Sequence, residues 1–80
     1  MIRLSFPNGV IYYGPSDGKG NTEKFKIDID GLIYSGAFHK GLFSGSITRP
    51  AYDDMYGTVE MYNEGQLVER CGIDEDGLLV

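Results

Sequence analysis

A glycine–aromatic pattern that occurs twice, 22 residues apart, constrains the fold of this chain more than any other feature. In residues 30–38, DGLIYSGAF, an aromatic residue follows Gly31 by three positions and a glycine follows it by five. In residues 8–14, NGVIYYG, the same residue types follow Gly9 at the same offsets. A third, degraded copy begins at Gly65. Repeats of this length with one hairpin per unit are typical of an elongated β structure whose units bury their faces by stacking.

The composition also favours an all-β protein. The chain has 12 glycines and six tyrosines in 80 residues, and a glycine costs about 1 kcal/mol at each helix-interior position. No stretch shows the apolar spacing of three and four residues that is typical of a helix. We therefore expect a single domain over residues 1–80, folded as an antiparallel meander of about seven or eight short strands with repeat-like hairpins.

The hairpin at residues 30–31 is predicted in most detail, because Asp-Gly is a standard two-residue hairpin turn. Such a turn pairs Ile29 with Leu32 and Ile27 with Tyr34. Apolar and polar residues alternate before the turn, so the large apolar side chains share one buried face. That face consists of Phe25, Ile27, Ile29, Leu32 and Tyr34.

The other strands are bounded by turn and loop signals. They are expected at residues 2–6, 10–13, 42–48, 56–62, 66–73 and 78–80. Residues 7–9, Pro-Asn-Gly, suit a three-residue loop closed by a positive φ, and chain reversals are expected at residues 39–41 and 63–65. The proline and paired aspartates of residues 49–54 predict a loop. Residues 16–21, SDGKGN, lack the spacing of a phosphate-binding loop, so we expect a flexible turn there.

Charge is distributed unevenly along the chain, whose formal net charge is −5. Residues 1–40 contain five basic and four acidic residues, a net charge of +1, whereas residues 41–80 contain two basic and eight acidic residues, a net charge of −6. The acidic half would repel a phosphate backbone, so direct nucleic-acid binding is disfavoured. A protein partner with a basic surface is favoured instead.

Few residues are candidates for catalysis or metal binding. His39 is the only histidine, and a general base needs a nucleophile and an orienting group beside it, so we expect a solvated turn residue. Cys71 is the only cysteine and can form neither an internal disulfide nor a thiolate zinc site. The cluster at residues 74–76 lacks the bidentate glutamate of a calcium loop, so a solvated turn is favoured. We therefore expect no enzyme, no metal and no cofactor.

The expected location is cytoplasmic. No apolar run approaches the roughly 18–20 residues of a membrane span, and residues 1–9 lack the apolar stretch of a secretory signal. The sequence therefore predicts no membrane span.

Residues 34–45, YSGAFHKGLFSG, resemble the MORN repeat. The matching residues, at relative positions 1, 3, 5, 8 and 12, are Tyr34, Gly36, Phe38, Gly41 and Gly45. Residues 57–65 are similar to the second half of such a unit. The chain departs from the pattern at Ile47, where a glycine would stand, and in extra residues before Gly57. The resemblance covers about half of the chain and implies an extended twisted sheet that serves as a scaffold or contacts proteins or lipid, with no catalytic residues.

The leading functional hypothesis is a non-catalytic protein-binding module. Small acidic proteins can act by occupying a basic surface, and a nucleic-acid-handling enzyme has such a surface. We expect a phage-type inhibitor of the anti-CRISPR or anti-restriction kind. The alternative is a MORN-like scaffold that contacts lipid or assembles with itself through exposed strand edges, and a homodimer is expected on the same ground. An enzyme is the third and least favoured hypothesis.

The candidate partner-binding residues are the acidic residues and neighbouring tyrosines of the C-terminal half. They are Tyr52, Asp53, Asp54, Tyr56, Glu60, Glu64, Asp74, Glu75 and Asp76. Tyrosine is a favoured interface anchor because its side chain is large and rigid and can form a hydrogen bond at one end.

Overall fold

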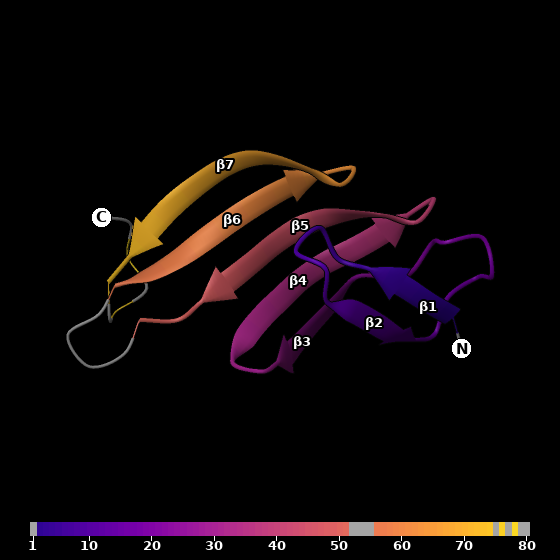
Figure 1. The fold of residues 1–80 in the computed structure, drawn as a ribbon, viewed down its shortest axis with the longest axis horizontal. Coiled ribbons are helices and arrows are strands. Elements are labelled where there is room, and N and C mark those ends of the chain that lie inside the picture. The colour runs from indigo at the N-terminus through magenta and orange to yellow at the C-terminus, as the bar shows by residue number, and fades with distance from the viewer. Residues whose placement is uncertain (1, 52–55, 75, 77, 79–80) are drawn as a thin grey trace.

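A computed structural model describes residues 2–51, 56–74, 76 and 78. They form seven strands: β1 (Ile2–Ser5), β2 (Ile11–Gly14), β3 (Phe25–Ile29), β4 (Leu32–His39), β5 (Leu42–Arg49), β6 (Gly57–Asn63) and β7 (Gln66–Ile73). β1 and β2 form a two-stranded sheet, and β3 to β7 form a five-stranded sheet in chain order, with every pair antiparallel (Figure 1). The predicted all-β meander is confirmed. The strand expected at residues 78–80 falls largely outside the described residues.

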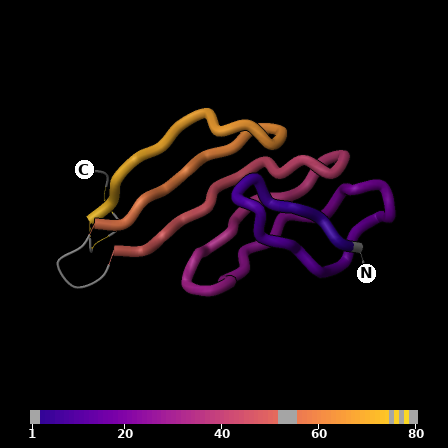
Figure 2. Tube along the Cα trace, in the orientation of Figure 1, coloured from indigo at the N-terminus to yellow at the C-terminus, as the bar shows by residue number. Residues whose placement is uncertain are grey.

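The molecule is elongated, with extents of 42 × 23 × 19 Å. In Figure 1 the β1–β2 hairpin lies across β3 and β4. β6 and β7 form the opposite edge of the five-stranded sheet and curve away from that hairpin. Figure 2 shows that the chain repeatedly folds back beside the segment that precedes it. We call β3 to β5 with the overlying β1–β2 hairpin the two-layer part. We call β6 and β7, with the turn that joins them, the β6–β7 hairpin.

The β3–β4 hairpin has the predicted register. Ile29 pairs with Leu32 and Ile27 pairs with Tyr34. The turn residues 30–31 have φ angles of 52° and 83°, as a turn with two left-handed central residues requires. Tyr34 is buried, and the other four apolar residues of the predicted face are half-buried and pack against the core. The predicted apolar face is therefore confirmed.

Two other turns are shorter than predicted. Residues 40–41 and 64–65 are two-residue turns, because His39 pairs with Leu42 and Asn63 pairs with Gln66. The φ angles of Lys40 and Glu64 are 52° and 48°. A left-handed residue before each glycine gives the turn a twist that matches the twist of the flanking strands. The strand pairing therefore includes His39 and Asn63, which the sequence had assigned to the turns.

Phe6, which directly follows β1, joins the two layers. Its ring centroid lies 4.2 Å from that of Tyr34, 5.1 Å from that of Phe38 and 5.0 Å from that of Phe43, and it is only 2% exposed. The predicted three-residue loop follows it, with φ of 91° at Gly9. The core cluster of buried residues comprises Leu4, Phe6, Tyr12, Tyr34, Phe38, Phe43 and Ile47.

Gly36 and Gly45 form a row without side chains at the centre of the β4–β5 pair. Their φ angles are 146° and 154°, a region that favours glycine. A Cβ on Gly36 would collide with the carbonyl oxygen of Ser44, and one on Gly45 would collide with that of Ser35. These two glycines therefore allow the two strand backbones to approach closely.

Candidate functional site

Of the predicted partner-binding residues, the five that the structure describes lie at different places along the β6–β7 hairpin and the segments next to it. Four of the nine, Tyr52, Asp53, Asp54 and Glu75, lie outside the described residues. Tyr56 directly precedes β6 and Asp74 directly follows β7, and both belong to one end of the sheet because Gly57 pairs with Ile73. Asp76 is exposed in the segment after β7.

The other two predicted residues lie elsewhere on the hairpin. Glu64 stands in the turn at the opposite end of β6, a strand of seven residues that spans about 20 Å by the rise of an extended strand. It is exposed and its Oε1 lies 3.8 Å from Nδ1 of His39, which is also exposed, as predicted for that histidine. The acidic side chains therefore lie at both ends of the β6–β7 hairpin, with Asp74 at one end and Glu64 at the other.

Glu60 forms contacts within the β6–β7 hairpin. Its Oε2 lies 3.5 Å from Nε of Arg70, and its Oε1 accepts a hydrogen bond of 3.2 Å from the hydroxyl of Tyr62. Burial, followed by the negative charge of Glu60, raises the pKa of Tyr62 above its usual 10.0. The ion pair with Arg70 partly offsets the charge of Glu60, which weakens the case for this residue as a partner contact.

Exposed apolar side chains lie on the same two strands as these charges, and the sequence alone did not reveal their exposure. Leu67 and Val68 of β7 are 50% and 63% exposed, and Met61 of β6 is also exposed. Among the described strands, β7 pairs only with β6, so its outer edge is unpaired. A register shift lies between Met61 and Tyr62. The apolar pair at residues 67–68 is visible in the sequence, but its position on an outer strand follows only from the sheet order.

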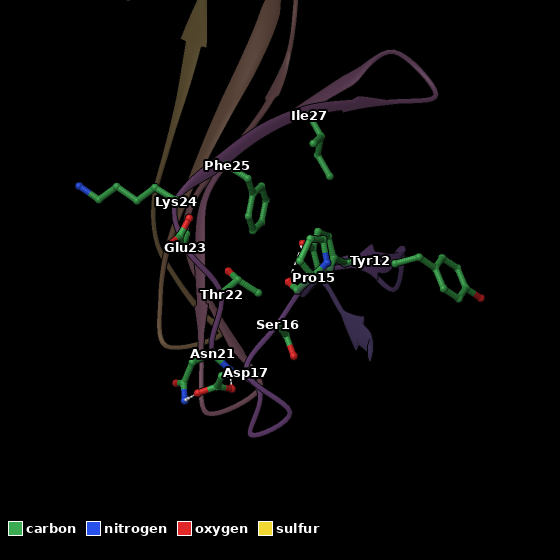
Figure 3. A pocket seen from close by; sticks show the side chains of 11 residues that line it. Tyr12, Pro15, Ser16, Asp17, Asn21, Thr22, Glu23, Lys24, Phe25 and Ile27 are labelled. Atoms are coloured by element: carbon green, nitrogen blue, oxygen red, sulfur yellow. Dashed lines mark hydrogen bonds between the residues drawn. The ribbon is translucent and has the colours of Figure 1, made fainter. Parts of the chain in front are cut away.

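A second surface feature is a groove of about 880 Å³ between β2, the loop that follows it and β3. Phe25 and Ile27 project from β3 toward Tyr12 and Pro15, as Figure 3 shows. The rings of Tyr12 and Phe25 are stacked, with centroids 5.1 Å apart and an angle of 16° between their planes. The floor of the groove is therefore apolar and largely aromatic.

Hydrogen bonds hold the loop that forms the rim of this groove, which is the turn expected at residues 16–21. Oδ1 of Asp17 accepts hydrogen bonds from the backbone N–H groups of Lys19 and Asn21, at 2.7 and 3.1 Å. Oδ2 accepts a bond of 2.7 Å from Nδ2 of Asn21. The side-chain bond, followed by the backbone bonds, lowers the pKa of Asp17 below its usual 3.8. Asp17 therefore remains a fixed carboxylate at neutral pH.

The rim is also anchored to the five-stranded sheet. The backbone N–H of Lys40 donates to Oδ1 of Asn21 at 2.9 Å, and the N–H of Gly41 donates to the carbonyl of Gly20 at 3.0 Å. A Cβ on Gly20 would collide with the backbone N of Gly41. The loop and the β4–β5 turn are therefore in close backbone contact, for which glycine is required.

Cys71 is half-buried in β7 and carries a free thiol. Within the described ranges, no three His, Cys, Asp or Glu side chains are grouped as they are around a metal ion. The same ranges contain no helix that is long and apolar enough to cross a membrane. Comparisons with protein-family models, with curated proteins and with solved structures found no match to this chain.

Proposed function

We propose that the chain is a non-catalytic protein-binding module that docks its partner on the β6–β7 hairpin. One observation carries the proposal: β7 is an outer strand of eight residues whose Leu67 and Val68 are exposed. The unpaired N–H and C=O groups of an outer strand can accept a strand of another protein. The exposed apolar side chains supply contact area that hydrogen bonds alone lack.

The charge around this strand favours a basic partner. The described residues 56–78 contain five acidic side chains, those of Glu60, Glu64, Glu69, Asp74 and Asp76, and one basic side chain, that of Arg70. Complementary charges chiefly raise the association rate, whereas desolvated apolar contacts slow dissociation. A more specific form of the proposal is an inhibitor, of the phage anti-CRISPR or anti-restriction kind, that occupies the basic surface of a nucleic-acid-handling enzyme. Its support is the net charge of −5.

The test is affinity capture from source-cell extract, quantified by mass spectrometry, with the native protein and two variants. The double variant Leu67→Ser and Val68→Ser removes the apolar contacts without changing charge. The control, Ser5→Asn, alters an exposed residue of β1 without changing charge. The proposal requires one protein that the native chain and the control retain and the double variant loses. Equal retention by all three would contradict it.

The captured protein then permits a kinetic test. We expect its association with the native protein to slow as salt is added, because charges on the surface are screened over about 8 Å at physiological ionic strength. The double variant should dissociate faster and associate at a similar rate. Association that is indifferent to salt would remove the support for a basic partner.

A self-assembling scaffold is the second candidate. It is supported by the outer strands β3 and β7, which each pair with one neighbour among the described strands, and by the MORN-like motif. In this case the partner strand is β7 or β3 of a second copy. Light scattering that gives the monomer mass of 8.8 kDa at high concentration would exclude this candidate and the homodimer.

A further inference from the structure

We infer that the groove beside β3 binds an extended segment of a partner protein, one that adds to the free edge of β3 and places an apolar and an arginine side chain in the groove. This site is separate from the β6–β7 hairpin and does not depend on the proposed function. Three features of the described residues support it: the outward backbone groups of β3, the apolar floor of the groove and the acidic rim.

The register of the β3–β4 hairpin identifies the free backbone groups. In a two-residue hairpin, the pair next to the turn, here Ile29 and Leu32, exchanges hydrogen bonds, and such pairs alternate along the ladder. Ile27 and Phe25 therefore direct their N–H and C=O groups toward β4. Lys26 and Asp28 direct theirs to the other side, where no described strand pairs with β3.

The apolar floor gives an added strand a place for its side chains. Every second side chain of such a strand would lie on the same face of the sheet as Phe25 and Ile27. These two residues are half-buried, and the Tyr12 ring that stacks on Phe25 is held by a hydrogen bond of 3.2 Å from its hydroxyl to the carbonyl of Pro15. The groove volume of about 880 Å³ is within the range of roughly 300–1,000 Å³ for ligand sites.

The rim selects a cation. Asp17 and Glu23 line the groove, and the hydrogen bonds of Asp17, which lies beside Asn21 in Figure 3, keep its carboxylate in place. Lys24 is the one lysine of the lining, and Figure 3 shows its side chain pointing away from Tyr12 and Phe25. A guanidinium group can bind a carboxylate and stack on an aromatic ring at the same time, which an ammonium group does less well.

These features together define which residues a segment bound in the groove should have, and in which order. An antiparallel strand beside β3 would pass Ile27 before it reaches Phe25 and the rim. Its apolar residue would therefore precede its arginine by two positions, because side chains two residues apart share one face. The chemistry of the occupant is apolar-x-Arg in an extended conformation.

The test is an NMR titration of the native 80-residue chain with a short capped peptide in which leucine and then arginine alternate with threonine. We expect saturable shift changes at the amides of residues 17 and 24–28. We also expect slower hydrogen exchange at Lys26 and Asp28, whose N–H groups would become bonded. A peptide with N-methylated alternate residues cannot form the strand bonds and should not bind.

Variants test the role of the rim. The double variant Asp17→Asn and Glu23→Gln removes both charges at nearly constant size, and we expect it to weaken binding about tenfold or more, as the loss of a charged hydrogen bond does. Asp76→Asn, exposed beyond β7, is the matched control and should bind like the native protein. Spectra of the free variants establish that each is folded.

Several results would overturn the inference. They are the absence of saturable binding, equal binding of a peptide with glutamate in place of arginine, and shift changes confined to β7. Equal affinity for arginine amide alone would indicate a small-cation site rather than strand addition. The Leu67→Ser and Val68→Ser variant should bind the peptide normally, so this inference and the proposed function can fail separately.

Discussion

The two-layer part and the β6–β7 hairpin share the same kind of turn but differ in what covers their apolar residues. The two-layer part contains all seven buried residues of the core cluster. In the β6–β7 hairpin, Ile73 is the one described apolar side chain that is buried, whereas Met61, Leu67 and Val68 are exposed. A short Gly-containing turn therefore specifies a hairpin, but a second layer decides whether the hairpin contributes to the core or presents a surface.

Because of this difference, we expect the two-layer part to supply most of the stability and the β6–β7 hairpin to supply the binding surface. Burial of apolar surface is the dominant favourable contribution to folding, so we expect most of the free energy of unfolding to come from the two-layer part. The β6–β7 hairpin depends on its pairing with β5. Such regions, with few buried contacts, are the ones that open at low free energy and that binding partners commonly use.

The largest effect is expected for Phe6→Ala, which tests whether the β1–β2 layer stabilises the whole chain. Phe6 packs within about 6 Å of five other aromatic rings, and truncation of a buried phenylalanine typically costs about 3–5 kcal/mol. We expect a loss of this size in urea unfolding followed by circular dichroism. A loss below about 1 kcal/mol would mean that the second layer is dispensable.

Gly36→Ala should have the next largest effect, and Gly31→Ala is its matched comparison. Both positions have positive φ, but a Cβ on Gly36 would also meet the backbone of β5, whereas a Cβ on Gly31 would meet nothing within 4 Å. Strain from φ alone costs on the order of 1–3 kcal/mol. We expect Gly31→Ala to lie within that range and Gly36→Ala to exceed it in denaturant unfolding. Equal losses would show that close backbone approach at Gly36 is unimportant.

A smaller effect should appear at alkaline pH and should be specific to the β6–β7 hairpin. Because the pKa of Tyr62 is raised in the folded state, the folded protein binds the phenolic proton more tightly than the unfolded protein does. The stabilisation is complete below pH 10 and is lost as the pH rises through the raised pKa. Unfolding measured between pH 8 and 11 should show this loss, and Tyr62→Phe should remove its contribution. Glu60→Gln should reduce the loss, since one cause of the raised pKa is then absent.

The smallest effect on stability is expected for Leu67→Ser. An exposed substitution away from the core usually changes stability by less than about 0.5 kcal/mol. We expect the urea midpoint to remain within that limit while partner capture is reduced. A destabilisation similar to that of Phe6→Ala would contradict the division between the two parts.

The local features of the fold were predictable because they depend on residues that are near in sequence. The Asp30-Gly31 turn fixes the register of its hairpin because the residues that flank the turn, Ile29 and Leu32, must pair with each other. The turns at residues 40–41 and 64–65 were predicted one residue too long, because Lys40 and Glu64 do not indicate a positive φ as glycine does. Asparagine and aspartate adopt left-handed turn conformations more readily than lysine and glutamate do, so the Asp30-Gly31 turn was recognisable and these two turns were less so.

The candidate sites were less predictable because they depend on the order and layering of strands. Glu60 and Glu64 are four residues apart in sequence, but the hairpin places one in an internal ion pair and the other in a distant turn. The groove requires Tyr12 of β2 to stack on Phe25 of β3 across the intervening loop. No local pattern indicates that contact, although the aromatic residues themselves are visible.

The identity between sheet order and chain order has a consequence for folding during synthesis. Each strand from β4 to β7 pairs with the strand that directly precedes it, so its partner already exists when it leaves the ribosome. The β1–β2 hairpin is made first, yet Phe6 and Tyr12 find their aromatic neighbours only after β3, β4 and β5 have emerged. Until β5 has been made, those two rings have no complete second layer to cover them. The rings of the β1–β2 hairpin therefore wait for later strands before they are covered, whereas β6 and β7 can pair as soon as they are made.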